Sequence, residues 1–147
     1  MVCISSTLSL IRYTGFYVES SLFPAPRYVK EDAQGQTNSP KLLLLAPFCG
    51  KPACQLINVT PGKARGVCAD AYLDAQTKLV PDVDAYPGHI ACDGETKSEV
   101  VCPLILPQDK TVVGVLDLDC LALGGFDAAD AAGLQKIADL IVKACDW

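Results

Sequence analysis

The feature that most constrains the fold is a pair of strand-like segments, residues 98–106 and 111–120, joined by the four-residue turn Pro107-Gln108-Asp109-Lys110. A connection this short favours an antiparallel hairpin, because parallel strands need a long crossover. Pro103 lies inside the first segment and has no N–H to donate to a sheet ladder. Residues 98–106 are therefore expected to form an edge strand or to carry a β-bulge.

The rest of the chain supplies further strands and two helices. Residues 8–19 alternate as a strand, with Tyr13, Gly15 and Tyr17 on one face. The remaining elements are expected to be short strands at 42–47, 53–59 and 79–83, and a helix at 67–75. Strands with hairpin connections and helices packed against them are typical of an α+β domain, with a central antiparallel β-sheet flanked by helices.

The last helix is expected to follow Asp127, whose side chain is a suitable N-cap. Leu134, Ile137, Ile141 and Cys145 recur at helical spacing. This spacing predicts that these four residues form the face buried against the sheet.

Length and charge exclude several classes of function. The chain of 147 residues fits one domain, 1–147, in which residues 19–41 are expected to form a long mobile loop. A net charge of -5 argues against binding to nucleic acid or to an anionic membrane surface. No apolar run approaches the roughly 18 residues needed to span a bilayer. Eight cysteines are too few for a disulfide scaffold, so a reducing, cytoplasmic compartment is expected.

Three carboxylates are expected near one end of the hairpin. Asp117 and Asp119 lie on the same face of their strand, roughly 7 Å apart, whereas Leu118 points to the other face. Simple pairing places Glu99 opposite Leu118, and a one-residue bulge would place it opposite Asp117 or Asp119 instead. The cluster is either a solvated strand end or a cleft in which crowding raises one pKa, so that one carboxyl stays protonated.

Three cysteines are candidates for thiol chemistry. Cys92 lies on a loop with the single histidine, His89, where a thiol among polar groups can be partly exposed and reactive. The alternative for any one of these cysteines is a small buried hydrophobic residue, which is the commoner case. Cys68 begins a helix after a glycine turn, a position where the helix dipole favours the thiolate. Cys54 has Lys51 nearby.

The remaining cysteines carry less chemical signal. Cys102 and Cys120 are expected to be buried core residues, like Cys145, while Cys3 and Cys49 cannot be assigned a place. A zinc site that combines His89 with Cys92, Cys54 or Cys49, as in a hydrolase, is an alternative, but paired Cys-x-x-Cys knuckles are absent. The residues by themselves indicate a small acidic enzyme with loop thiols near a carboxylate cluster.

Six sequence blocks carry a resemblance to a known family. They are Tyr13-Thr14-Gly15-Phe16-Tyr17, Gly50-Lys51-Pro52-Ala53-Cys54, Gly66-Val67-Cys68, residues 87–93, Ser98-Glu99-Val100-Val101 and residues 114–119. Together and in this order they resemble the free methionine-(R)-sulfoxide reductases, which have a GAF-type fold. The resemblance covers nearly the whole chain from Leu10 onward.

The resemblance implies reduction of free L-methionine-(R)-S-oxide to L-methionine without a metal or other cofactor. Cys92 would be the nucleophile, which keeps the oxygen as a sulfenic acid. Cys54 would resolve it as a disulfide, and Cys68 would take part in recycling. A thioredoxin or tryparedoxin-like protein would then reduce the disulfide by exchange. The resemblance also implies a homodimer.

The family's substrate-binding positions are matched by five residues of this chain, Glu99, Asp117, Asp119, Tyr13 and Tyr17. The carboxylates would hold the substrate ammonium group and, where protonated, polarise the sulfoxide oxygen. The two tyrosines would line the pocket for the methyl-sulfur end, a contact suited to a polarizable sulfur.

This sequence departs from the family at several points. Tyr13 stands where the family usually has Trp, Cys49 where it has Gln, and Cys120 where it has Ser. The segment between Cys54 and Cys68 is longer than usual, and the helix common at the family's N-terminus has little counterpart here. Because GAF-type folds also serve as sensors, a non-catalytic small-molecule or redox sensor is the alternative function.

Overall fold

The computed structural model describes residues 10–23, 40–51, 53–90 and 92–147. In chain order its strands and helices are β1 (Ile11–Glu19), a 3-10 turn (Ser20–Leu22), β2 (Leu42–Gly50), β3 (Leu56–Asn58), α2 (Val67–Asp74), β4 (Lys78–Val80), a second 3-10 turn (Val83–Ala85), β5 (Ser98–Ile105), β6 (Val112–Cys120) and α3 (Ala128–Ala144). Most of the long loop predicted at 19–41 lies outside the described residues, and Glu19 itself belongs to β1.

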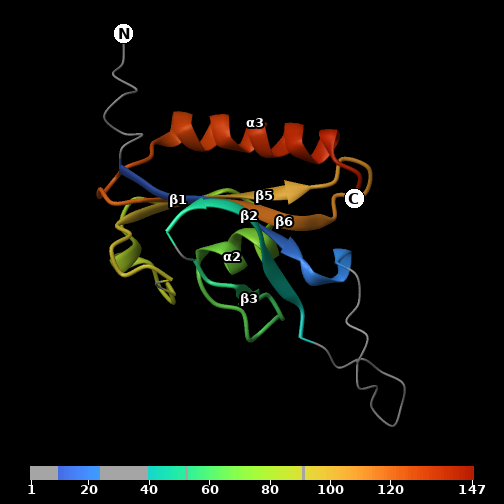
Figure 1. Ribbon diagram of the computed structural model, residues 1–147, viewed down its shortest axis with the longest axis horizontal. Coiled ribbons are helices and arrows are strands. Elements are labelled where there is room, and N and C mark those ends of the chain that lie inside the picture. Colours follow the sequence, from blue (N-terminus) through green and yellow to red (C-terminus); the bar gives the residue numbers. More distant parts are fainter. Residues whose placement is uncertain (1–9, 24–39, 52, 91) are drawn as a thin grey trace.

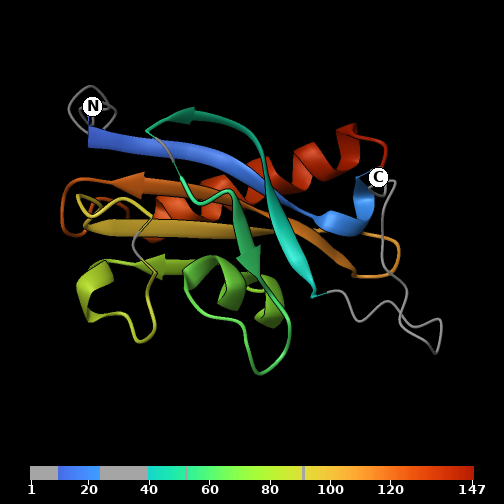
Figure 2. The same cartoon turned by 60° about the horizontal axis from the view of Figure 1, so that its bottom comes forward.

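The described strands form one antiparallel sheet in the order β3-β2-β1-β6-β5-β4. Helix α3 lies along one face, and α2 lies against the other together with the loops that connect the short strands (Figures 1 and 2). This arrangement confirms the predicted α+β class with a central antiparallel sheet flanked by helices. The central strands β1, β6 and β5 carry residues on both faces into the interior.

The two faces of the sheet bury different side chains. Toward α2, the core contains Tyr13, Tyr17, Val101 and Val115, which lie on the opposite face of β1, β5 and β6 from the residues that face α3. Toward α3, the core contains Val100, Cys102, Leu104, Leu116 and Cys120. The period of two predicted for 112–120 is therefore confirmed, and so is the burial of Cys102 and Cys120.

The short strands differ from their predicted bounds. Strand β2 continues to Gly50, and its last four residues are exposed rather than buried. Strands β3 and β4 each contain only three residues, and Val83 belongs to the second 3-10 turn instead of a strand. Turn residues on either side of each short segment end the pairing sooner than the apolar pattern suggests.

Strand β5, which contains Pro103, shows both features that were predicted as alternatives, a free edge and a β-bulge. Strand β5 pairs with β6 along its length, but β4 covers only Glu99 to Val101 on the other side. Pro103 thus lies on the part of β5 beyond β4, where its carbonyl accepts a hydrogen bond from Gln135 Nε2 at 3.1 Å. A register shift does occur in the hairpin, between Leu104 and Ile105.

Helix α3 begins where the sequence predicted, but it buries a different face. Asp127 Oδ1 accepts hydrogen bonds from the backbone N–H groups of Ala129 and Asp130. In return, Asp130 Oδ2 accepts a hydrogen bond from the Asp127 N–H, which completes a capping box. The fully buried residues of the helix are Ala138 and Val142. The predicted face was wrong for Ile137, which is 49% exposed, and for Cys145, which follows the helix and is exposed.

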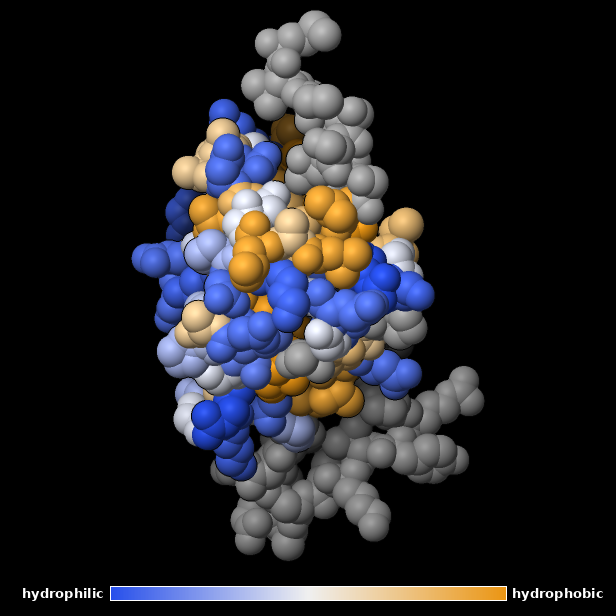
Figure 3. Space-filling model, turned by 90° about the vertical axis from the view of Figure 1, so that its left-hand side faces the viewer, coloured by the Kyte–Doolittle hydropathy of each residue, from blue (hydrophilic) through white to orange (hydrophobic). Residues whose placement is uncertain are grey.

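Apolar side chains also reach the surface. Figure 3 shows one end of the molecule, on which an apolar patch borders a hydrophilic band. Elsewhere the largest exposed apolar side chains include Leu140, 64% exposed on the outer side of α3. None of the helices among the described residues is long and apolar enough to cross a membrane.

Candidate active site

A cavity of about 190 Å³ opens on the α2 side of the sheet. Its wall is built by β6, the start of β5, the N-terminal turn of α2 and the two loops that carry Cys54 and Cys92. The residues that line it include Tyr17, Cys54, Lys63, Arg65, Cys68, His89, Cys92, Thr96, Glu99, Asp117 and Asp119. The cavity therefore brings the predicted thiols and the predicted carboxylates into one place.

The hairpin register sets the carboxylate cluster. Glu99 pairs with Asp119, and Val101 pairs with Asp117. The observed pairing is therefore the predicted alternative that requires a bulge. The register shift lies between Leu104 and Ile105, just after Pro103. Glu99 and Asp117 are each only 5% exposed, so the cluster is a buried wall and not a solvated strand end.

Burial and mutual repulsion control the protonation of these carboxyl groups. Burial, followed by the charge of Asp119, raises the pKa of Glu99 to about 8. Burial and the neighbouring Glu99 raise the pKa of Asp117 well above its ordinary value. Burial raises the pKa of Asp119 only to about 6, because the nearby His89 side chain opposes the shift. Near pH 7, Asp119 is therefore mostly ionised while Glu99 keeps its proton, and burial favours the protonated form of Asp117.

Some oxygens on this wall lack a partner. Among the described residues, Asp117 Oδ1 and Thr96 Oγ1 are buried side-chain atoms without a hydrogen bond. An unsatisfied buried polar atom costs about 1–3 kcal/mol. Both residues line the cavity, so a ligand with a hydrogen-bond donor could satisfy them.

Cys54 and Cys92 form a disulfide across the mouth of the cavity. Their Cα atoms are 5.3 Å apart although the residues are 38 positions apart in the sequence. Cys54 precedes β3, and Cys92 lies on the loop between the second 3-10 turn and β5. Cys92 is exposed, as predicted for a loop thiol. The pair can therefore alternate between a dithiol and a disulfide without rebuilding the sheet.

Cys68 is placed differently from the prediction of a thiolate at a helix start. Its thiol is buried, and Sγ lies 3.8 Å from Glu99 Oε1. Burial, followed by the charges of Asp117 and Glu99, raises the pKa of Cys68 well above its ordinary value. The expected thiolate was wrong because desolvation and nearby carboxylates outweigh the dipole of a helix of eight residues.

Three of the side chains named for the zinc alternative, those of His89, Cys92 and Cys54, make other contacts in the structure. Cys54 and Cys92 are bonded to each other, and His89 Nε2 faces Glu99 Oε2 at 3.6 Å. Within the described ranges, the ligand atoms that meet within 4.8 Å of one another belong to Cys68, Glu99 and Asp117. A cation held there would occupy the same wall as the unpaired oxygens.

The two tyrosines lie in one buried cluster on the same face of β1, as predicted, but they relate differently to the cavity. Tyr17 lines the cavity, whereas Tyr13 is buried beside it and packs against Phe48 with ring centroids 6.0 Å apart. Of the remaining cysteines, Cys49 and Cys145 are exposed. Cys3 lies outside the described residues.

Several residues of the site were not predicted from the sequence. Thr96, Lys63 and Arg65 line the cavity, and Arg12 binds the loop that carries Cys92. Lys63 and Arg65 lie in a turn, and no pattern in the sequence joins that turn to the carboxylates. No spacing pattern joins Arg12 to its partner either, because Asp93 lies 81 positions away in the sequence.

Comparison with known proteins gives a consistent assignment. No family model matches the chain. The free methionine-R-sulfoxide reductase of Saccharomyces cerevisiae is 45% identical over 135 residues, 92% of this chain. A solved GAF domain is 45% identical and superimposes with a TM-score of 0.73 over 95% of this chain and 68% of its own.

Two solved reductases agree with these matches. The Neisseria meningitidis free methionine-R-sulfoxide reductase, solved with its substrate, is 36% identical over 90% of this chain, with a TM-score of 0.71. The fRMsr of Staphylococcus aureus, solved in its reduced form, is 35% identical over 91% of this chain, with a TM-score of 0.67. The chain spans 63% of the length of the yeast relative, 66% of the Neisseria chain and 71% of the Staphylococcus chain.

Proposed function

Because the chain belongs to the free methionine-(R)-sulfoxide reductase family, with the GAF fold, we propose that it reduces free L-methionine-(R)-S-oxide to L-methionine with its own cysteine thiols. One observation carries the proposal: the Cys54–Cys92 pair and the buried carboxylate wall share a single cavity. The yeast and Neisseria relatives named free methionine-R-sulfoxide reductase match about nine tenths of this chain, and the Neisseria protein was solved with its substrate.

Cys92 is proposed as the nucleophile. Its thiolate attacks the sulfoxide sulfur, methionine leaves, and the oxygen stays on Cys92 as a sulfenic acid. Exposure of Cys92 at the cavity mouth supports this role, because a substrate inside the cavity can reach it. The protein sulfur is oxidised by two electrons and the substrate sulfur is reduced by two.

Cys54 is proposed as the resolving cysteine. Its thiol displaces the hydroxyl of the Cys92 sulfenic acid, so that a disulfide forms and water leaves. The short Cα–Cα distance of 5.3 Å supports this step. Cys68 is proposed to take part in recycling, since it lines the same cavity; its raised pKa means that its proton must leave before it can attack a disulfide.

The carboxylate wall is proposed to bind the substrate's ammonium group. Asp119 supplies the negative charge near pH 7, and the unpaired Oδ1 of Asp117 accepts an ammonium N–H. Glu99, protonated up to about pH 8, donates a hydrogen bond to the sulfoxide oxygen and stabilises its developing charge. A peptide-bound methionine lacks the ammonium group, which explains selection of the free amino acid.

The two tyrosines contribute unequally to the proposed pocket. Tyr17 is proposed to contact the methyl-sulfur end, because its side chain lies in the cavity wall. Tyr13 is proposed to support the site from beside the cavity, where it is buried against Phe48. A Tyr17→Ala variant would therefore raise KM more than a Tyr13→Phe variant.

The proposal also extends to partners and location. The reductant is proposed to be a thioredoxin or tryparedoxin-like protein, which can reach a disulfide at the cavity mouth. Five free cysteines among the described residues suit a reducing compartment, which supports a cytoplasmic location. A single domain over 1–147 and a homodimer are further parts of the proposal, to be checked by limited proteolysis and light scattering.

The test follows methionine formed from free methionine-(R)-sulfoxide, with the (S) epimer and an N-acetylated sulfoxide as controls. Dithiothreitol and then a thioredoxin system serve as reductants. Turnover of the free (R) form alone, lost in Cys92→Ser, is the expected result. A folded, reduced protein that turns over none of the three would refute the proposal.

A further inference from the structure

The two segments that carry the disulfide meet at one residue of β1. The backbone carbonyl of Arg12 accepts a hydrogen bond from the Lys51 N–H at 3.2 Å, three residues before Cys54. Gly50 makes this approach feasible, because its φ is +113° and a Cβ there would lie 2.4 Å from the Arg12 carbonyl oxygen. The backbone of Arg12 therefore fixes the segment of the resolving cysteine.

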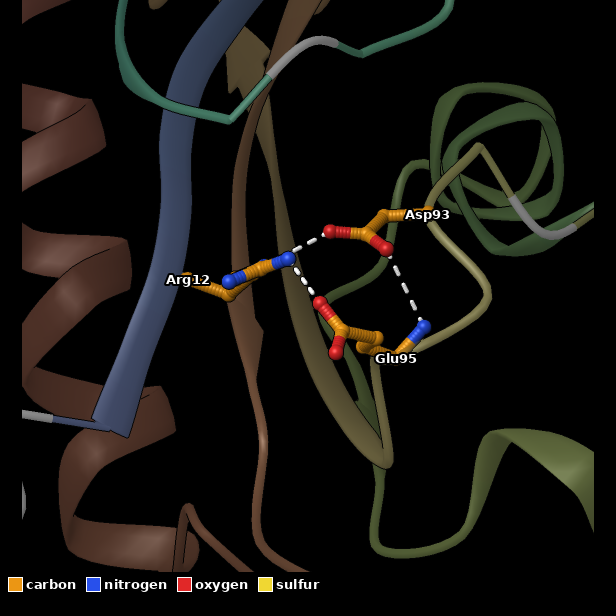
Figure 4. A network of polar contacts seen from close by, with 3 residues as sticks. All are labelled: Arg12, Asp93 and Glu95. Atoms are coloured by element: carbon orange, nitrogen blue, oxygen red, sulfur yellow. Dashed lines mark hydrogen bonds and ion pairs between the residues drawn. The ribbon is translucent and has the colours of Figure 1, made fainter.

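The side chain of Arg12 holds the other segment. Its Nε donates to Asp93 Oδ2 at 2.7 Å, and its Nη2 binds Glu95. The second oxygen of Asp93, Oδ1, accepts from the Glu95 N–H at 3.1 Å (Figure 4). Because Asp93 directly follows Cys92, the guanidinium fixes the segment of the proposed nucleophile.

The contact is more than an exposed ion pair. The side chains of Arg12 and Asp93 are only 20% and 19% exposed, and the hydrogen bond from Arg12 lowers the pKa of Asp93 below its ordinary value. Both oxygens of the Asp93 carboxylate are bonded. Networks of this kind hold geometry better than isolated surface pairs do.

From these contacts we propose that Arg12 is a positioning residue, which holds the Cys54 and Cys92 segments together while their thiols are reduced and so speeds formation of the disulfide. This rests on the proposed function. In the step concerned, the Cys54 thiol attacks the Cys92 sulfenic acid, the S–S bond forms, the S–O bond breaks, and water leaves.

The reason is one of effective concentration. Once the disulfide is open, only noncovalent contacts keep two residues 38 positions apart within reach of each other. Arg12 directly precedes Tyr13, the residue from which β1 pairs on both sides with β2 and β6, so its anchor is the start of a central strand. Without the guanidinium, the Cys92 loop samples positions from which Cys54 is out of reach, and ring closure slows.

The experiment compares Arg12→Met and Arg12→Lys with a matched control, Lys97→Met. Lys97 pairs with Asp84 at 3.0 Å, and these two side chains are 40% and 70% exposed. In single turnover with reduced enzyme, methionine formation reports attack by Cys92. Loss of dimedone-reactive sulfenic acid reports resolution by Cys54.

Arg12→Met is expected to slow resolution by about tenfold while methionine formation changes by less than about twofold. Arg12→Lys is expected to recover part of the rate, since lysine keeps the charge without the planar fork. Lys97→Met should leave both steps unchanged. Equal slowing of both steps, or no slowing of resolution, would overturn the proposal.

A second readout needs no substrate and stands if the proposed function fails. The equilibrium of the Cys54–Cys92 disulfide with dithiothreitol should shift toward the dithiol by about tenfold in Arg12→Met. If Arg12→Met does not fold, Glu95→Gln removes one contact of the same guanidinium and should shift the equilibrium in the same direction by about two- to threefold. An unchanged equilibrium in the folded variants contradicts the role of Arg12.

Discussion

Glu99 should make the stability of the protein fall as pH rises. The residue is 5% exposed, and burial, with the charge of Asp119 second, raises its pKa from 4.5 to about 8. Between these values the folded chain keeps a proton that the unfolded chain releases. The folded state thus binds more protons, so the free energy of unfolding decreases as pH increases, and the loss is complete above about pH 8.

The size of this effect follows from the shift. Each pH unit in this window lowers the free energy of unfolding by about 1.36 kcal/mol. From about pH 5 to about pH 8 the loss is about 4 kcal/mol, a large part of the roughly 5–15 kcal/mol that stabilises a typical domain. A Glu99→Gln variant keeps the shape of the protonated side chain but has no proton to release. The free energy of unfolding of this variant should therefore lack the pH-dependent loss caused by Glu99.

The assay is urea unfolding followed by circular dichroism at about pH 5, 6, 7 and 8, with dithiothreitol present throughout. Near pH 5, Glu99→Gln should match the parent protein within about 1 kcal/mol. Near pH 8 it should be more stable than the parent by several kcal/mol. The control Asp146→Asn removes an exposed carboxylate and should follow the parent at every pH. A difference between Glu99→Gln and the parent that stays constant with pH would refute the reasoning.

Three further predictions concern packing and exposure. Gly114→Ala should destabilise the fold by about 2 kcal/mol or more in urea unfolding, because its Cβ would lie 2.3 Å from a β1 carbonyl oxygen. Gly133→Ala, which has open space around it on α3, should instead stabilise the fold by about 0.5–1 kcal/mol. Equal effects of the two substitutions would contradict this packing. Asp127→Ala removes the N-cap of α3 and should lower stability by about 1–2 kcal/mol, with a lower Tm in calorimetry; an unchanged Tm would argue against the capping box. In mass spectrometry of the reduced, folded protein, iodoacetamide should label Cys49 and Cys145 well before the buried core thiols, and uniform labelling would contradict the burial pattern.

The hairpin and the carboxylate wall could be read from the sequence because they depend on local rules. Alternation along residues 112–120 places Asp117 and Asp119 on one face whatever the surrounding fold is. The partner of Glu99 was less certain, since a single bulge changes every pair beyond it. The structure resolves this with a shift between Leu104 and Ile105.

Features that depend on tertiary packing were not predictable in the same way. The helical spacing of Ile137 and Cys145 suggested burial, but the sheet contacts the neighbouring face that contains Ala138 and Val142. Small residues such as alanine mark a close helix–sheet contact that a count of large apolar residues overlooks.

The thiols show the same limit. A helix start predicts a lowered thiol pKa for Cys68, yet its burial against Glu99 and Asp117 raises that pKa. These carboxylates lie on other elements, 31 and 49 positions away in the sequence, and spacing along the chain does not reveal such contacts. Arg12 escaped notice for the same reason, because its partner Asp93 is 81 positions away.

The most direct measurement of the central claim is a single turnover without added reductant, using the Cys54→Ser variant and free methionine-(R)-sulfoxide. About one methionine per chain is expected, together with a dimedone adduct located on Cys92 by mass spectrometry. Cys92→Ser should form neither product. Methionine formed by Cys92→Ser, or an adduct on another cysteine of the Cys54→Ser variant, would contradict the assignment of Cys92 as the nucleophile.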